Sequence, residues 1–257
     1  MDYRLCLDEL RRRSLLPRDY VAVYAGGSLV RGWGNATSDL DIFVVAPTRW
    51  ESESAQLDTV ALDPNTIPVE GIYVGDRRWD IEYWLESQVD ELLGKIAADQ
   101  LEGSQPAGRR MADAEIGFLQ KLSHSVPIDK DDWWEARRRR LAGSPLRTVL
   151  ALRAMHEMDI YTEDAVGQLA AGDVESAVLS AKMAWLYAVH TLLSSHGEFG
   201  ESPKWFARRF RAANPPELSF DEYWAAETMR SFDPAAPERW VEEILGLCQR
   251  ISTELVL

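Results

Sequence analysis

The stretch YAGGSLVRGWGNATSDLDIFVV, residues 24–45, decides the fold. It runs from an apolar strand into a turn of small residues and then into a second apolar strand that begins with two acids. Asp39 and Asp41 are two positions apart, so on an extended strand both carboxylates point to the same face. Like charges held side by side repel each other unless a cation, usually a divalent one, lies between them. The spacing therefore predicts a metal site at the start of the second strand.

The turn before the acids has the composition of a phosphate-binding site. Gly27 lacks a Cβ, so the backbone can approach a ligand closely there. Ser28 adds a hydroxyl at the expected start of a helix, where free N–H groups and the helix dipole favour phosphate. Arg31 follows one turn later, either to help hold a phosphate or as a surface charge. A phosphate site and a metal site separated by one short loop predict a protein that handles a triphosphate.

The order of these features resembles that of a known family. A strand, a Gly-Ser turn, a short connection and two acids flanked by apolar residues are the hallmark of the nucleotidyltransferase superfamily of DNA polymerase β. Gly27, Ser28, Asp39 and Asp41 fall on the positions of that hallmark, and Ser38 takes the frequent place just before the first acid. The resemblance implies a metal-dependent transferase that uses a nucleoside triphosphate.

A later segment carries the candidate third acid. Residues 68–85 predict a β-hairpin about a Gly-Asp turn, and its second arm puts Asp80 and Glu82 on one face. The resembling family needs a third acid on a neighbouring strand, as a metal ligand and candidate base. We choose Asp80 because apolar residues flank it and it lies one step earlier. Glu82 is the alternative, and two acids that merely face water are the remaining interpretation.

After residue 86 nearly every segment shows helical periodicity, interrupted by Gly, Pro or Asn. The clearest predicted helices cover residues 114–122, 131–142, 145–170, 174–195, 205–213, 220–229 and 238–255. A further helix is predicted over residues 49–58, and residues 103–108 predict a joint. We therefore expect an α+β protein with an N-terminal α/β nucleotidyltransferase domain on a mixed sheet, residues 1–105. An all-α helical bundle for substrate and nucleotide binding is expected to follow, residues 106–257.

The predicted two-lobe arrangement also resembles the aminoglycoside adenylyltransferases, in which a helical lobe supplies contacts to the acceptor and the triphosphate. Lys204 follows a proline at the start of a predicted helix, where the helix dipole disfavours a cation. An ammonium group in that place indicates an anionic ligand. In the resembling enzymes a lysine of the helical lobe reaches the triphosphate, which makes Lys204 the candidate for that contact.

Composition limits the partners and the compartment. The formal net charge of −14 argues against a sequence-independent hold on nucleic acid, and it is compatible with a cationic or neutral small acceptor. No apolar run approaches the roughly 20 residues of a bilayer span, so no membrane partner is expected. Residues 1–4 begin no signal peptide, and Cys6 and Cys248 define no disulfide framework, so a reducing cytoplasm is expected. The oligomeric state is left open.

These patterns predict an enzyme that moves a nucleoside monophosphate onto a hydroxyl of a small molecule with release of pyrophosphate. Our first choice is AMP, with ATP as its donor. The resemblance implies two Mg²⁺ ions held by Asp39, Asp41 and Asp80, with another nucleoside triphosphate as the alternative to ATP. The nucleotide contacts it implies are Gly27, Ser28, Arg31, Ser38 and Lys204. Two other hypotheses stay open. One is a non-catalytic, antitoxin-like or regulatory module, and the other is a nucleotidyltransferase that acts on a protein or a tRNA.

Overall fold

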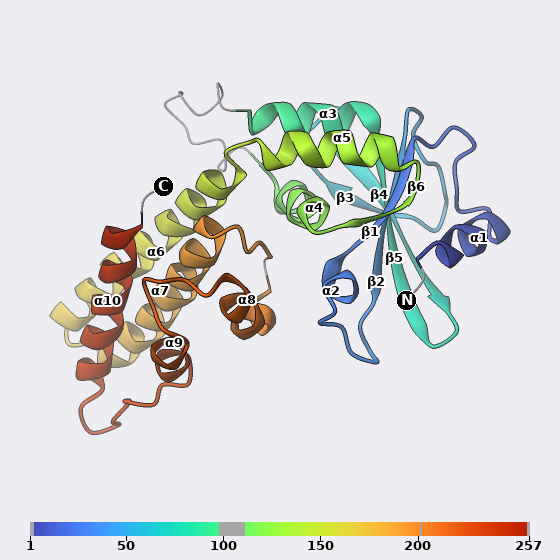
Figure 1. The fold of residues 1–257 in the computed structure, drawn as a ribbon. Coiled ribbons are helices and arrows are strands. Elements are labelled where there is room, and N and C mark those ends of the chain that lie inside the picture. Colours follow the sequence, from blue (N-terminus) through green and yellow to red (C-terminus); the bar gives the residue numbers. More distant parts are fainter. Residues whose placement is uncertain (1–2, 98–110, 201, 256–257) are drawn as a thin grey trace. The chain divides into compact units, whose positions relative to one another are not determined.

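The chain divides into two compact units, Met1–Ser144 and Pro145–Leu257. The computed structural model describes residues 3–97, 111–200 and 202–255 (Figure 1). The first unit extends well beyond the boundary predicted near residue 105, because the chain returns to the sheet after that point. The predicted joint at residues 103–108 lies outside the described residues.

The described residues of the first unit form a mixed sheet of six strands in the order β3-β4-β5-β2-β1-β6. The strands are β1 Ala22–Gly26, β2 Leu40–Ala46, β3 Gln56–Thr59, β4 Thr66–Val74, β5 Arg77–Leu85 and β6 Val126–Asp129. Strands β2 and β5 run parallel, and the other neighbouring pairs are antiparallel. The predicted mixed sheet and the predicted hairpin of β4 and β5 are both confirmed.

Helices lie on both faces of this sheet, with α3, α4 and α5 on one side and α1 on the other (Figure 1). The helices of the first unit are α1 Leu5–Arg12, α2 Gly27–Val30, α3 Glu86–Lys95, α4 Asp113–Ser123 and α5 Asp131–Ala142. On the α4 side, the Tyr24 and Phe43 rings stack with centroids 4.9 Å apart, and Phe118 of α4 meets Phe43 edge-on at 5.8 Å. On the α1 side, Leu10 joins a cluster with Leu40 and Ile42. Alternate apolar side chains of β2 therefore pack into two separate cores, one on each face of the sheet.

Two short strands differ from the sequence prediction. The helix predicted over residues 49–58 is wrong, because β3 occupies the end of that segment and pairs antiparallel with β4. Strand β6 was not predicted, since it is four residues long and contains Pro127. Proline is tolerated in an edge strand, where one side of the ladder needs no partner. In both cases pairing with a distant strand outweighs the local pattern.

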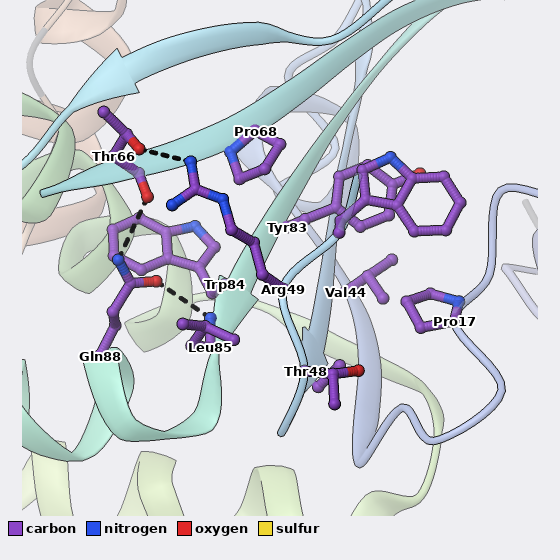
Figure 2. A pocket seen from close by; sticks show the side chains of 12 residues that line it. Pro17, Val44, Thr48, Arg49, Thr66, Pro68, Tyr83, Trp84, Leu85 and Gln88 are labelled. Atoms are coloured by element: carbon purple, nitrogen blue, oxygen red, sulfur yellow. Dashed lines mark hydrogen bonds between the residues drawn. The ribbon is translucent and has the colours of Figure 1, made fainter. Parts of the chain in front are cut away.

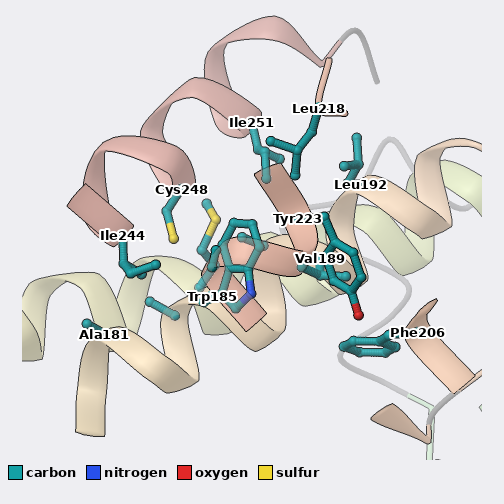
Figure 3. Packing of buried hydrophobic residues seen from close by; sticks show 14 of the residues in the cluster. Ala181, Trp185, Val189, Leu192, Phe206, Leu218, Tyr223, Ile244, Cys248 and Ile251 are labelled. Carbon is teal, nitrogen blue, oxygen red and sulfur yellow. The ribbon is translucent and has the colours of Figure 1, made fainter. Parts of the chain in front are cut away.

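The second unit is a helical bundle, as the sequence predicts. Its described helices are α6 Leu146–Ala170, α7 Val174–Ser195, α8 Phe206–Ala213, α9 Phe220–Glu227 and α10 Pro237–Glu254, with a 3₁₀ turn at Pro203–Trp205. Fully buried alanines on α7 let neighbouring helices approach closely, and Trp185, Tyr223 and Ile244 fill the centre of the bundle (Figure 3). None of the described helices has the length and apolar content that a membrane crossing requires.

Arg209 is a buried cation in the second unit and gives a stability prediction. Its side chain is 1% exposed, and its guanidinium donates to the Gly200 carbonyl at 2.6 Å and to the Glu198 carbonyl. We expect Arg209→Met to lower the free energy of unfolding of the second unit by about 2 kcal/mol, because buried carbonyl oxygens lose a charged donor. Chemical denaturation followed by circular dichroism measures the change.

The matched control for this prediction is Arg208→Met, since Arg208 is the exposed neighbour on the same helix. A surface substitution of this kind is expected to change the free energy of unfolding by no more than about 0.5 kcal/mol. Equal destabilisation by the two substitutions would contradict the role assigned to Arg209.

Candidate active site

The turn after β1 brings a glycine against the second acid of the pair. Strand β1 ends at Gly26, which is level with Asp41 in the antiparallel ladder of β1 and β2. Gly27 has a φ of +77°, and a Cβ placed on it would lie 1.9 Å from Oδ2 of Asp41. A residue with a side chain cannot occupy that position without displacing the carboxylate. The backbone at residue 27 and the Asp41 carboxylate therefore share one small space.

Three acids lie on one face of the neighbouring strands β2 and β5, and a fourth precedes β2. Asp41 and Asp80 are register partners in the parallel pair, and Phe43 is the partner of Glu82. Residues two apart on a strand share a face, so Asp41, Asp80 and Glu82 lie on the face that α4 covers. Asp39 immediately precedes β2. The two acidic segments are thus neighbours in the sheet, with Asp41 level with Asp80.

Two cations lie among these acids. Lys121 of α4 places its Nζ 2.8 Å from Oδ1 of Asp41 and 3.3 Å from Oε1 of Glu82. Nε of Arg78 lies 2.7 Å from Oδ1 of Asp80. The hydrogen bond to Asp80 raises the pKa of the Arg78 guanidinium, and the charge of Asp39 adds to that rise. The site therefore balances the repulsion between its carboxylates with the chain's own side chains.

Burial sets the electrostatics around Glu82. Its pKa is raised by burial, and the charge of Lys121 and the hydrogen bond from Trp84 oppose that rise. Burial alone would lower the pKa of Lys121, but the charges of Glu82 and Asp41 reverse this and raise it. The Tyr24 hydroxyl is buried nearby without a hydrogen-bond partner among the described residues, and burial, together with the charge of Glu82, raises its pKa. These polar groups under α4 therefore lie in surroundings that are partly shielded from water.

The acids fit a magnesium site by donor type, since carboxylate oxygens are the ligands that Mg²⁺ prefers. Oδ2 of Asp41 lies against the backbone of Gly27, where a Cβ would come within 1.9 Å of it. As the side chains stand in residues 3–97, 111–200 and 202–255, no three His, Cys, Asp or Glu groups are close enough to share one ion. In this arrangement Asp41 pairs with Lys121, and Asp80 pairs with Arg78.

The predicted nucleotide-binding residues of the first unit lie in one connection between β1 and β2. Ser28 is the second residue of the short helix α2, which begins at Gly27, and its carbonyl accepts from the backbone N–H groups of Trp33 and Gly34. The Arg31 guanidinium stacks 3.6 Å from the centroid of the Trp33 ring. The Ser38 hydroxyl accepts from the backbone N–H of Asn35 at 2.9 Å, so this serine shapes the loop before Asp39.

Lys204 lies in the second unit, on the 3₁₀ turn before α8, rather than in the first turn of a long helix. Its side chain is exposed, and its Nζ lies 5.5 Å from the centroid of the Trp205 ring. The dipole argument for an anionic ligand is weaker on so short a turn. A contact between Lys204 and a triphosphate stays a prediction from the family resemblance.

The sequence prediction missed the two cations. Arg78 has a local signal, because it lies two positions before Asp80 on the same strand and so shares its face. Lys121 has only a weak one, as a single lysine one helical turn after Phe118 on a helix whose buried side chains are mostly apolar. Nothing near Asp41 in the sequence indicates that a residue 80 positions later contacts it.

Two hollows in the described part of the first unit lie away from the acids. One, of about 10 Å³, has room for roughly one water molecule and is lined by Arg49, Thr66, Tyr83 and Gln88 among others (Figure 2). The other, of about 530 Å³, is open to solvent and is lined by Arg11, Arg18, Tyr20 and Trp50 among others. The predicted site residues line neither of these two hollows.

The first unit is thus an α/β domain in which a Gly-Ser turn after β1 meets Asp41 on the neighbouring strand. Residues 4–97 match the family model described as a nucleotidyltransferase domain. These residues therefore form a nucleotidyltransferase domain of the DNA polymerase β-like superfamily, which confirms the resemblance seen in the sequence.

A crystal structure of a nucleotidyltransferase-like protein from Exiguobacterium sibiricum 255-15 has a similar fold, with a TM-score of 0.51 and 12% sequence identity. The match covers 98% of this chain and 75% of that one. At this identity the likeness extends to the fold alone. No protein of curated function matches the sequence.

Proposed function

We propose that the protein transfers AMP from ATP to a hydroxyl group of a small molecule and releases pyrophosphate. The observation that carries the proposal is the contact between Gly27 and Asp41, in which a Cβ would come within 1.9 Å of the carboxylate. A turn so close to an acid brings backbone N–H groups and a metal-binding oxygen to one point. A triphosphate with its metal needs both of these contacts together.

Each group of the first unit has a part in this reaction. Ser28 and the N–H of Gly27 hold the pyrophosphate end of the nucleotide, with Arg31 and Ser38 beside them. The acceptor oxygen forms a bond to the α-phosphorus while the bond from that phosphorus to the bridging oxygen breaks. Asp80 takes the proton that the acceptor hydroxyl loses. Most of the rate then comes from positioning and from stabilising charge on the phosphates.

Asp39, Asp41 and Asp80 are the residues that would hold two Mg²⁺ ions. When bound, Mg²⁺ would offset the charge of the phosphates and lower the pKa of the acceptor hydroxyl. Without an ion, Asp80 pairs with Arg78 and Asp41 pairs with Lys121, so that each of these two carboxylates has a cation as its partner. The acid cluster and the phosphate turn then receive the metal and the nucleotide together.

The test is an assay of pyrophosphate release with Mg²⁺ and labelled ATP. The acceptors are a panel of amino sugars and polyols, a tRNA mixture and a protein mixture, and the other nucleoside triphosphates are run in parallel. We expect release with a hydroxyl-bearing small molecule and label on that molecule. Label on tRNA or on protein would replace this proposal by the macromolecular alternative. A folded protein that binds no Mg²⁺-nucleotide by calorimetry would favour the non-catalytic module.

Substitutions on β5 separate the two candidates for the third acid. Asp80 is partly exposed and pairs with Arg78, which is itself exposed, whereas both oxygens of Glu82 are bonded, to Lys121 and to Trp84. We expect Asp80→Asn to lower the rate of transfer by about a hundredfold or more, because it removes the base. Glu82→Gln keeps the side-chain volume and an acceptor oxygen, and we expect a loss of less than about tenfold. Initial rates at saturating nucleotide measure both, and the reverse order of effects would assign the base to Glu82.

A further inference from the structure

Lys121 contacts two of the acids and has no part in the chemical steps of the proposed reaction. We propose that Lys121, held by Glu82, is a positioning residue that fixes the orientation of the Asp41 carboxylate for metal binding. This inference rests on the proposed function, since it concerns how the same site holds its metal-nucleotide.

The geometry divides the two oxygens of Asp41 between two tasks. Oδ1 accepts from Nζ of Lys121 at 2.8 Å, and Oδ2 lies on the side of Gly27, where a Cβ would meet it at 1.9 Å. An aspartate side chain with one oxygen bonded in this way has a fixed rotation about its last torsion. The hydrogen bond to Lys121 therefore leaves Oδ2 directed toward the phosphate turn.

Lys121 in turn is held from the other side. Its Nζ donates to Oε1 of Glu82 at 3.3 Å, and Oε2 of Glu82 accepts from the indole N–H of Trp84 at 3.0 Å. Asp41 and Glu82 are each 17% exposed at the side chain, so all three charged groups lie in a partly desolvated layer under α4. Trp84 and Phe118 pack at 4.2 Å between ring centroids and fix the strand and the helix that carry them.

This arrangement matches the outer shell of a metal site. Side chains that orient a metal ligand without touching the metal change affinity or activity by about 10- to 100-fold when they are removed. It also gives Glu82 a role of its own, because a carboxylate with both oxygens bonded serves as the anchor of Lys121 and leaves Asp80 as the third ligand.

The experiment uses a charge-balanced double variant, Lys121→Met together with Glu82→Gln, in the full chain. The pair removes one positive and one negative charge, so the net charge near Asp41 is unchanged and the readout reports orientation. The probe is Mn²⁺ with α,β-methylene-ATP, which cannot transfer its nucleotide, and bound Mn²⁺ is counted by electron paramagnetic resonance. We expect Mn²⁺ affinity in this complex to fall by about tenfold.

The matched control is Lys95→Met with Glu115→Gln, which removes another partly buried Lys-Glu pair of the first unit, 3.2 Å apart. We expect the control to bind Mn²⁺ with the affinity of the parent chain. A folded Lys121–Glu82 double variant with parent-like Mn²⁺ affinity would overturn the proposal. If that variant does not fold, Lys121→Arg replaces it, and a drop in Mn²⁺ affinity of at least about threefold is then required.

The two proposals fail in different ways. A parent chain that binds no Mn²⁺ with the analogue would overturn the proposed function and this inference together. A parent chain that binds it, with an unaffected Lys121–Glu82 double variant, would overturn only the role of Lys121. In the transfer assay the double variant is expected to have a lower kcat and an unchanged KM for the acceptor. A loss of folded protein would also lower the apparent kcat, but it would leave Mn²⁺ binding per folded molecule unchanged.

Discussion

Asp41→Asn is expected to lower the rate of nucleotidyl transfer by about a thousandfold while the protein stays folded. Asp41 has two roles in the proposed site. It is a metal ligand level with Asp80, and it contacts Gly27 of the phosphate turn. A metal ion stabilises transition-state charge by several kcal/mol, and each 1.36 kcal/mol corresponds to a factor of ten in rate. An asparagine amide keeps the shape of the side chain and one oxygen, but it removes the negative charge that holds the ion.

The measurement compares initial rates of pyrophosphate release for the parent chain and the variant with the best acceptor of the panel. Folding of the variant is expected to persist, because Lys121 keeps its second partner, Glu82, when the charge of Asp41 is removed. Asp58→Asn is the control, since Asp58 is an exposed acid on the edge strand β3. Full activity of Asp41→Asn would remove the metal-dependent scheme, and inactivity of Asp58→Asn would show that the assay reports a general effect of charge.

The sheet could be predicted from the sequence wherever a strand carries its own alternating pattern. Strand β2, Leu40–Ala46, is the apolar strand predicted after the Gly-Ser turn, and β5 places its acids on one face as its alternation requires. Strands β3 and β6 carry no such pattern, because each is short, lies at an edge of the sheet and takes its hydrogen bonds from one neighbour. Their existence depends on which distant strand offers a free edge, and local residue types do not encode that.

The boundary between the units shows the same limit. The glycines at residues 103 and 108 have the composition of a linker, and helical periodicity begins soon after them. The structure instead returns the chain to the sheet, where β6 pairs with β1 before the bundle begins at Pro145. This return brings Lys121 to the acids. A residue whose contact depends on such a long-range pairing cannot be found from spacing, whereas the acids, whose spacing is local, could be.

Gly27→Ala is expected to remove measurable transfer, and its effect combines two costs that the structure separates. An alanine at a φ of +77° lies in the left-handed region, which costs an L-residue roughly 1–2 kcal/mol. In addition its Cβ would come 1.9 Å from Oδ2 of Asp41 and 2.9 Å from the carboxyl carbon, so the carboxylate must move or the turn must shift. Either movement separates the phosphate turn from Asp41, and we expect the rate to fall at least about a hundredfold, since removing a single positioned donor at the developing charge already costs that much.

Gly75→Ala carries the backbone strain without the clash, so a comparison of the two variants isolates the effect of the clash. Gly75 also has a positive φ, +58°, but a Cβ there would meet nothing within 4 Å. The two variants therefore share the backbone strain. Gly75→Ala is expected to lower the free energy of unfolding by about 1–2 kcal/mol in denaturant titrations, and Gly27→Ala by at least that amount. Only Gly27→Ala should lose pyrophosphate release and binding of Mg²⁺-ATP by calorimetry. If both variants keep transfer, the close approach of residue 27 to Asp41 is incidental. If both lose it equally, backbone strain rather than displacement of the carboxylate is the cause, and the shared space between the turn and the acid would no longer support the proposed site.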